Sequence, residues 1–197
     1  MCKALFLGGV TNRFPQLRFG FMEGGVAWAA QLYTSLVSYR EKRNRDAIRN
    51  YDPAAVDLGL LAELFARHGH GYPTLDLRTA LGVGMSAEDE FVDEWAGSGA
   101  LSAADVRDRF AGPFFFGCEA DDPLVPLAFE LDAPLNVMFS SDISHWDVPD
   151  MARILPEAYE AVEDGRLSAE AFRSFVFSNA HRFYTDGNPA FFEGTKL

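Results

Sequence analysis

Three short apolar stretches, each followed by a helical pattern, constrain the fold of this chain more than any other feature. They cover residues 18–23, 113–118 and 135–139 and are rich in aromatic and aliphatic side chains. Such runs, ended by Gly, Asp or Ser, are typical of β-strands. Strands that alternate with helices favour a parallel sheet with crossover helices. The sequence therefore predicts an α/β fold.

The helices are predicted from spacing and capping. Apolar residues fall at helical intervals over residues 26–37, after the first stretch. After the second stretch, Asp121-Asp122-Pro123 predicts a helix start. After the third, we expect helices over 149–162 and 168–177, the last with Ser168 as its N-cap.

Residues 52–112 interrupt this alternation. They combine helical patterns with several glycines, and Ser102 opens an S-x-x-D capping signature that ends at Asp105. We expect residues 1–197 to form a single domain in which 52–112 is a helical insertion, suited to act as a lid over a site.

The charge balance restricts the partners. The 197 residues carry a formal net charge of −12, which disfavours nucleic acids and anionic membrane surfaces. No apolar stretch approaches the roughly 20 residues of a membrane span. Cys2 and Cys118 are too few for a disulfide framework and are expected to be reduced thiols, Cys118 buried and inert. We therefore expect a cytoplasmic protein that acts on a small molecule.

Asp142 is the residue that most suggests chemistry. It follows the third predicted strand, within the run SSDISHWD at 140–147. In parallel α/β folds, sites are built where strands end at their carboxyl side. A carboxylate there can bind a divalent metal and accept a proton from metal-bound water. A loop aspartate that accepts backbone N–H groups would give the same pattern, and spacing alone leaves both interpretations open.

Three motifs in order resemble one family. SSDISHWD resembles the last-strand motif of the amidohydrolase-related metal-dependent hydrolases, a group that includes the aminocarboxymuconate-semialdehyde decarboxylase-like barrels, although Ser144 stands where that motif usually has Pro. LGGVTNRFPQLRFGFMEGGVAW and SNAHRFY resemble two further segments of the family. The resemblance covers residues 4–40 and about 113–184.

The resemblance implies a partial (β/α)8 TIM barrel, made of the last three β/α units. It also implies a divalent metal, with zinc favoured, and makes Asp142 both a metal ligand and the base toward activated water. The family's other ligands, a His-x-His pair and one more His, are expected upstream of residue 1. The alternatives are decarboxylase (lyase) chemistry on the same fold, or a catalytically incomplete fragment that serves as a structural or oligomerisation unit. A homo-oligomer or a complementing chain is the expected partner, because three strands leave open edges and partly covered faces.

Two more residues are candidates for catalysis. Glu23 ends the first predicted strand, where the decarboxylase-like members of the family have a catalytic His. It is interpreted either as a substrate contact or acid–base group, or as a structural carboxylate at the Gly24-Gly25 turn. His145 either orients Asp142 or touches substrate, or else caps the next helix.

Other histidines and tryptophans are less informative. His68-Gly69-His70 has the spacing of a ligand pair, but it follows a helical run, which favours a helix C-terminus. Trp28 and Trp146 are expected to be packing residues.

Overall fold

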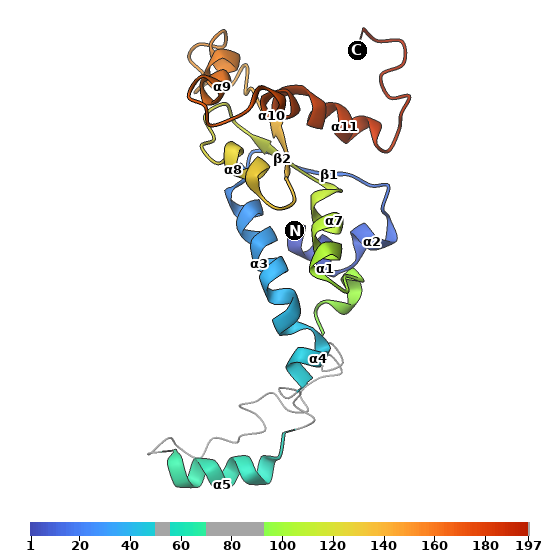
Figure 1. Ribbon diagram of the computed structural model, residues 1–197, viewed down its shortest axis with the longest axis vertical. Helices are drawn as coiled ribbons and strands as arrows, with labels where there is room; N and C mark the ends of the chain where they lie inside the picture. The colour runs from blue at the N-terminus through green and yellow to red at the C-terminus, as the bar shows by residue number, and fades with distance from the viewer. Residues whose placement is uncertain (50–55, 70–92, 197) are drawn as a thin grey trace. The chain divides into compact units, whose positions relative to one another are not determined.

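The computed structural model describes residues 1–49, 56–69 and 93–196, which fall into two compact units (Figure 1). The sheet unit comprises Met1–Val37 and Ser98–Leu197, and the 38–97 unit comprises Ser38–Gly97. In chain order the elements are α1 (Cys2–Leu7), α2 (Val10–Arg13), β1 (Phe19–Phe21), α3 (Ala27–Arg43), α4 (Arg45–Ile48), α5 (Leu58–His68), η4 (Ala96–Ser98), α7 (Ala103–Ala111), β2 (Phe114–Cys118), α8 (Val125–Glu130), β3 (Asn136–Phe139), α9 (Ile154–Glu163), α10 (Ala169–Arg173), η5 (Ser174–Ser178) and α11 (Asn179–Thr185).

The three predicted strands form one parallel sheet in the order β1-β2-β3. Phe19 pairs with Phe114 at one end of β1, and Cys118 pairs with Phe139 at the end of β2. The first strand is shorter than predicted, because Glu23 adopts a φ of +58°, which is incompatible with an extended strand. The prediction of an α/β fold with a parallel sheet is confirmed, and the arrangement is consistent with part of a TIM-barrel-like fold.

One face of the sheet packs on α3 and α7. Phe114 and Phe116 are fully buried, and the ring of Phe110 from α7 lies 5.2 Å from that of Phe114. Trp28 from α3 contacts Phe116 at a ring distance of 5.5 Å. Each fully buried side chain of this size contributes about 1.5–3 kcal/mol. This aromatic layer is therefore a main source of stability for the sheet unit.

The opposite face is covered by α11, as Figure 1 shows. The ring of Phe183 lies 5.3 Å from that of Phe115, so β2 is buried on both faces, as central parallel strands usually are. At the edge of the sheet, the Asn179 side chain donates a hydrogen bond to the Val137 carbonyl of β3 (2.9 Å). The expectation that the strand faces are only partly covered is wrong for β2, because α11 folds back onto the sheet.

Some predicted helix boundaries differ from the structure. The helix expected at Asp121-Asp122-Pro123 begins only at Val125, because the Asp122 carboxylate accepts backbone N–H groups in loops instead. The helix expected over 149–162 begins at Ile154. The Ser168 N-cap is confirmed by a 3.1 Å hydrogen bond from the Ala171 amide, and this last helix continues through η5 and α11.

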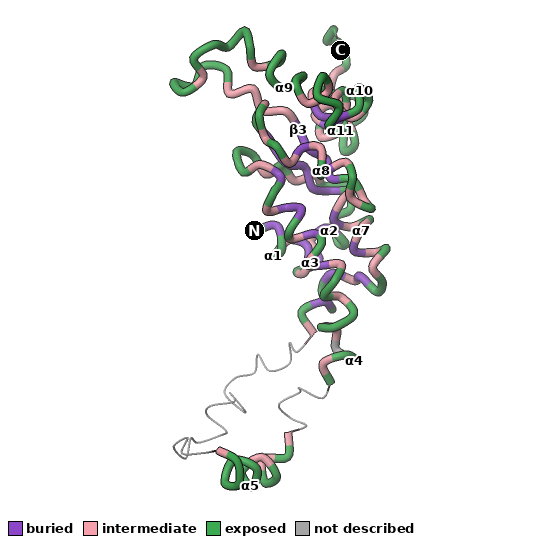
Figure 2. The backbone as a smooth tube through the Cα atoms, turned by 60° about the vertical axis from the view of Figure 1, so that its left-hand side comes forward, coloured by how far each residue is buried: buried purple, intermediate pink, exposed green. Residues whose placement is uncertain are grey.

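The predicted insertion is divided between the two units. Its last helix, α7, belongs to the sheet unit and begins with the predicted capping box of Ser102 and Asp105. Its helix α5 lies in the 38–97 unit and has no buried residue (Figure 2). Residues 50–55 and 70–92 of this region, including His70, lie outside the described residues. Among the helices that are described, none is long and apolar enough to cross a bilayer.

Candidate active site

The carboxyl ends of the three strands each lead into an acidic residue. Glu23 follows β1, Glu119 follows β2 and Asp142 follows β3. Because the strands are parallel, these residues lie at one edge of the sheet. Two adjoining cavities open there, and they share Glu119, Asp121 and Ser140 in their walls.

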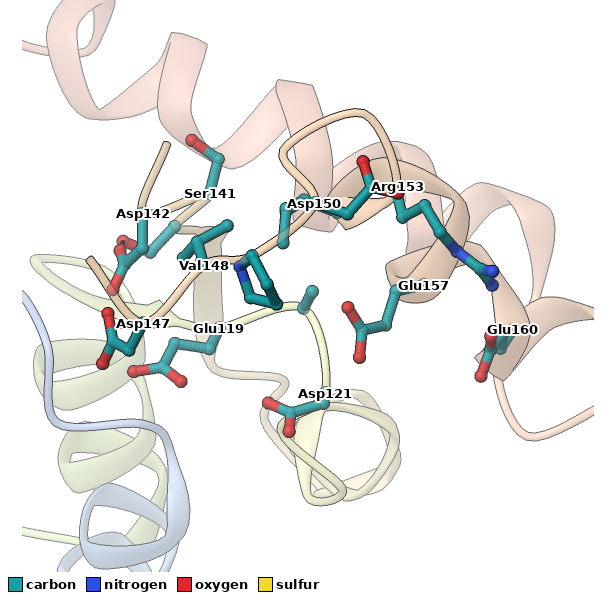
Figure 3. Close-up of a pocket in the computed structure, with 14 residues that line it drawn as sticks. Glu119, Asp121, Ser141, Asp142, Asp147, Val148, Asp150, Arg153, Glu157 and Glu160 are labelled. Carbon is teal, nitrogen blue, oxygen red and sulfur yellow. Dashed lines mark hydrogen bonds between the residues drawn. The ribbon is translucent and has the colours of Figure 1, made fainter. Parts of the chain in front are cut away.

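The larger cavity has a volume of about 430 Å³ and lies between the strand ends and α9. The carboxylates of Glu119, Asp142 and Asp147 gather at one end of it, and residues of α9 lie at the other (Figure 3). The lining side chains with charge are Glu119, Asp121, Asp142, Asp147, Asp150, Arg153, Glu157 and Glu160. The cavity is therefore strongly negative.

Asp142 is held in a strained loop. Its φ is +48°, and that of Ser144 is +86°. Non-glycine residues with positive φ are uncommon and cluster at functional sites. The Ser140 hydroxyl donates to Asp142 Oδ1 (3.0 Å), and the His145 amide donates to the Asp142 carbonyl (2.9 Å). Asp142 thus keeps its other carboxylate oxygen, Oδ2, for interaction with a ligand or with His145.

His145 lies beside Asp142 without lining either cavity. Its Nδ1 is 3.8 Å from both Asp142 Oδ2 and Asp147 Oδ1, and its side chain is 56% exposed. It does not cap the next helix, since α9 has Arg153 as its N-cap. This position suits a role in orienting the Asp142 carboxylate.

Glu23 lines the smaller cavity, whose volume is about 240 Å³. The Glu23 carboxylate makes no hydrogen bond within the described residues. No contact in this part of the chain therefore supports the alternative that Glu23 stabilises the Gly24-Gly25 turn. Glu23 and Asp142 lie in adjoining cavities, and Glu119 stands between them on the central strand.

Glu119 is the residue of this site that the sequence analysis missed. Loss of hydration raises the pKa of its carboxyl group, and the negative charges of Asp142, Asp121, Asp147 and Asp122 raise it further. The signal for it was present in the sequence, because Glu119 is the first residue after the second predicted strand and Asp142 comes three residues after the end of the third.

The described residues do not form a complete metal centre. No group of three or more His, Cys, Asp or Glu side chains that could hold a metal occurs among them. A carboxylate such as Asp142 is chemically suited to be one ligand of a divalent ion. A full ligand set would need donors from outside the described part of the chain.

The other sequence candidates lie elsewhere or differ from expectation. His68 is the last residue of α5, and the Gly69 amide closes that helix on the Phe65 carbonyl (2.8 Å), as predicted for a helix C-terminus. Trp28 is half-buried and packs against the Phe116 ring, as predicted for a packing residue. Trp146 is 94% exposed, so its prediction as a packing residue is wrong.

Cys118 is also as predicted. It is a free cysteine, 1% exposed, and burial raises the pKa of its thiol far above the ordinary value. A thiol in this state is not a nucleophile.

Comparison with known proteins identifies the family. Residues 4–185 match the family described as Amidohydrolase, and the chain belongs to this family. No curated protein and no solved structure matches the chain. Membership supports enzymatic function of the metal-dependent hydrolase or decarboxylase type.

Proposed function

We propose that this chain provides the Asp142 part of the catalytic centre of a metal-dependent hydrolase that acts on a small molecule. The observation that carries the proposal is the placement of Asp142. It lies within the matched family region, at the carboxyl end of β3, in a left-handed conformation and in the wall of a 430 Å³ cavity. Function in such folds resides in the strand-end site rather than in the fold itself.

Asp142 would act as a proton acceptor for the attacking water and as one ligand of a divalent metal, for which zinc is the first candidate. When bound, such an ion would lower the pKa of a water ligand and polarise the scissile bond. The hydrogen bond from Ser140 fixes Asp142 Oδ1, and His145 lies within 3.8 Å of Oδ2. The hydrogen bond from Ser140 restrains the carboxylate in an orientation that a base needs, and His145 would add to this restraint on closer approach to Oδ2. Glu23, in the adjoining cavity, would contact substrate or exchange a proton with it.

The test measures metal binding and hydrolysis together. Zinc binding by calorimetry and hydrolysis of simple esters and lactones are compared for the wild type, Asp142→Asn and Asp108→Asn. Asp108 is an exposed aspartate on α7 outside the site and provides the matched control. We expect Asp142→Asn to lower kcat by at least about 100-fold, the contribution typical of a lost general base, and Asp108→Asn to leave it unchanged.

A second candidate function is favoured by the edges of the sheet, because in the described part of the chain β1 and β3 each pair with one strand only. The chain would then be a catalytically incomplete unit that associates with a complementing chain or with its own copies. A wild-type protein that binds no zinc at saturating concentration would refute catalysis by this chain alone. Light scattering would then separate the remaining cases, because a well-folded monomer contradicts association with copies of the chain.

Decarboxylation is the variant chemistry that remains within the family. Glu23 at the end of β1, in place of the histidine of the decarboxylase-like members, argues against it. Release of CO2 from aromatic or unsaturated carboxylates, without hydrolysis of esters or lactones, would favour the lyase over the hydrolase.

A further inference from the structure

Asp122 connects two loops at the carboxyl edge of the sheet. One carboxylate oxygen, Oδ2, accepts the amide N–H of Val26 at the start of α3 (3.1 Å). The other, Oδ1, accepts the N–H of Leu124 in its own loop (2.9 Å). Val26 and Asp122 are 96 positions apart in the sequence. A single side chain therefore fixes the loop after β1 to the loop after β2.

The loop after β1 is the one that carries Glu23. Both Glu23 (φ +58°) and Gly25 (φ +61°) are left-handed, and the Gly25 amide donates to the Gly117 carbonyl of β2 (3.2 Å). A left-handed conformation costs a non-glycine residue about 1–2 kcal/mol, so the surroundings of Glu23 must hold it in place. The hydrogen bond from Val26 to Asp122 lies immediately after this turn.

The backbone at Gly25 and the Asp122 carboxylate are in close contact. A Cβ atom at Gly25 would lie only 2.8 Å from Asp122 Oδ2, so glycine is required there for two reasons, its φ and its contact with Asp122. Asp122, Glu23 and Gly25 also line the same 240 Å³ cavity. Both Asp122 oxygens are engaged with backbone amides, which leaves this residue suited to support the cavity rather than to react in it.

We infer that Asp122 is a positioning residue that sets the conformation of the Glu23-Gly24-Gly25 turn, and with it the place of the Glu23 carboxylate in the smaller cavity. The inference rests on the proposed function only in giving Glu23 a role in catalysis. Asp122 acts through the backbone of the turn.

The first test is independent of activity. Asp122→Asn preserves the shape of the side chain but replaces one acceptor oxygen with an NH2 group, which cannot accept a hydrogen bond from a backbone N–H. We expect the Val26 amide to exchange with solvent about tenfold faster, and the Glu23 HN–Hα coupling constant to leave the value of a left-handed residue. Asp108→Asn is the matched control and should change neither.

Asp122→Ala removes both acceptor oxygens and leaves the residues of the turn unchanged. We expect the same two NMR changes in it. If the remaining oxygen of Asp122→Asn stays on the Val26 amide, the alanine variant decides the question. An unchanged Glu23 coupling constant in folded Asp122→Ala protein would overturn the inference, whatever the activity.

The second test asks whether Asp122 acts through Glu23. In a double-mutant cycle on ester or lactone hydrolysis, Asp122→Asn should lower kcat in the wild type and have no further effect in Glu23→Gln. Additive effects would overturn the inference, because a merely structural loss would lower activity in both backgrounds. If the wild type hydrolyses nothing, the proposed function fails, while amide exchange and the Glu23 coupling constant still decide whether Asp122 sets the turn.

Discussion

The hydrogen bond at the outer edge of β3 gives a quantitative prediction. Asn179, 5% exposed, donates from its amide to the Val137 carbonyl (2.9 Å). Asn179→Ala removes this bond and leaves the buried carbonyl without that donor. A net hydrogen bond is worth about 1 kcal/mol, and an unsatisfied buried group costs about 1–3 kcal/mol. We expect the free energy of unfolding to fall by about 2 kcal/mol.

Urea denaturation followed by tryptophan fluorescence measures this loss, since Trp28 is packed against Phe116. With a urea dependence of about 2 kcal/mol per molar, the midpoint should fall by about 1 M. The matched control is Asn188→Ala, the same change at an exposed asparagine near the C-terminus, which should alter stability by less than about 0.5 kcal/mol. Equal midpoints for the two variants would refute the role given to Asn179 in closing the edge of the sheet.

Two further predictions concern ionisable groups. The hydroxyl of Tyr33 and the guanidinium of Arg107 lower the pKa of the Asp132 carboxyl in the folded protein. Above its ordinary pKa of 3.8 this carboxylate therefore stabilises the fold. That stability is lost as the pH falls through the lowered pKa of the folded state. Asp132→Asn should therefore weaken the decline of the urea midpoint between about pH 5 and pH 2, and a decline as steep as that of the wild type would contradict this. Burial raises the pKa of the Cys2 thiol to about 12 and raises that of Cys118 further. Neither thiol should therefore react with a thiol reagent at pH 8 until denaturant is added. Rapid reaction of the native protein would contradict this prediction, because it would show that the thiols are accessible.

Local patterns in the sequence were sufficient for the three strands, for two helix caps and for the family. The apolar runs placed all three strands, because buried parallel strands need continuous apolar side chains. The caps at Ser102 and Ser168 were predictable, because the atoms that form them are three residues apart. The place of Asp142 just past the end of β3 was predictable in the same way, since it follows the third apolar run within the region that matches the family.

Contacts between distant segments were decided only by the tertiary structure. Asp122 looked like a helix start, yet its carboxylate binds the Val26 amide 96 residues away, and the helix begins later. The local sequence SNAHRFY does not indicate that Asn179 donates a hydrogen bond to a carbonyl of β3, or that the Phe183 ring packs on Phe115. Hydrogen bonds and ring contacts of this kind depend on how the chain returns to the sheet. Sequence therefore determined which residues end the strands, whereas packing determined which side chains hold those ends in place.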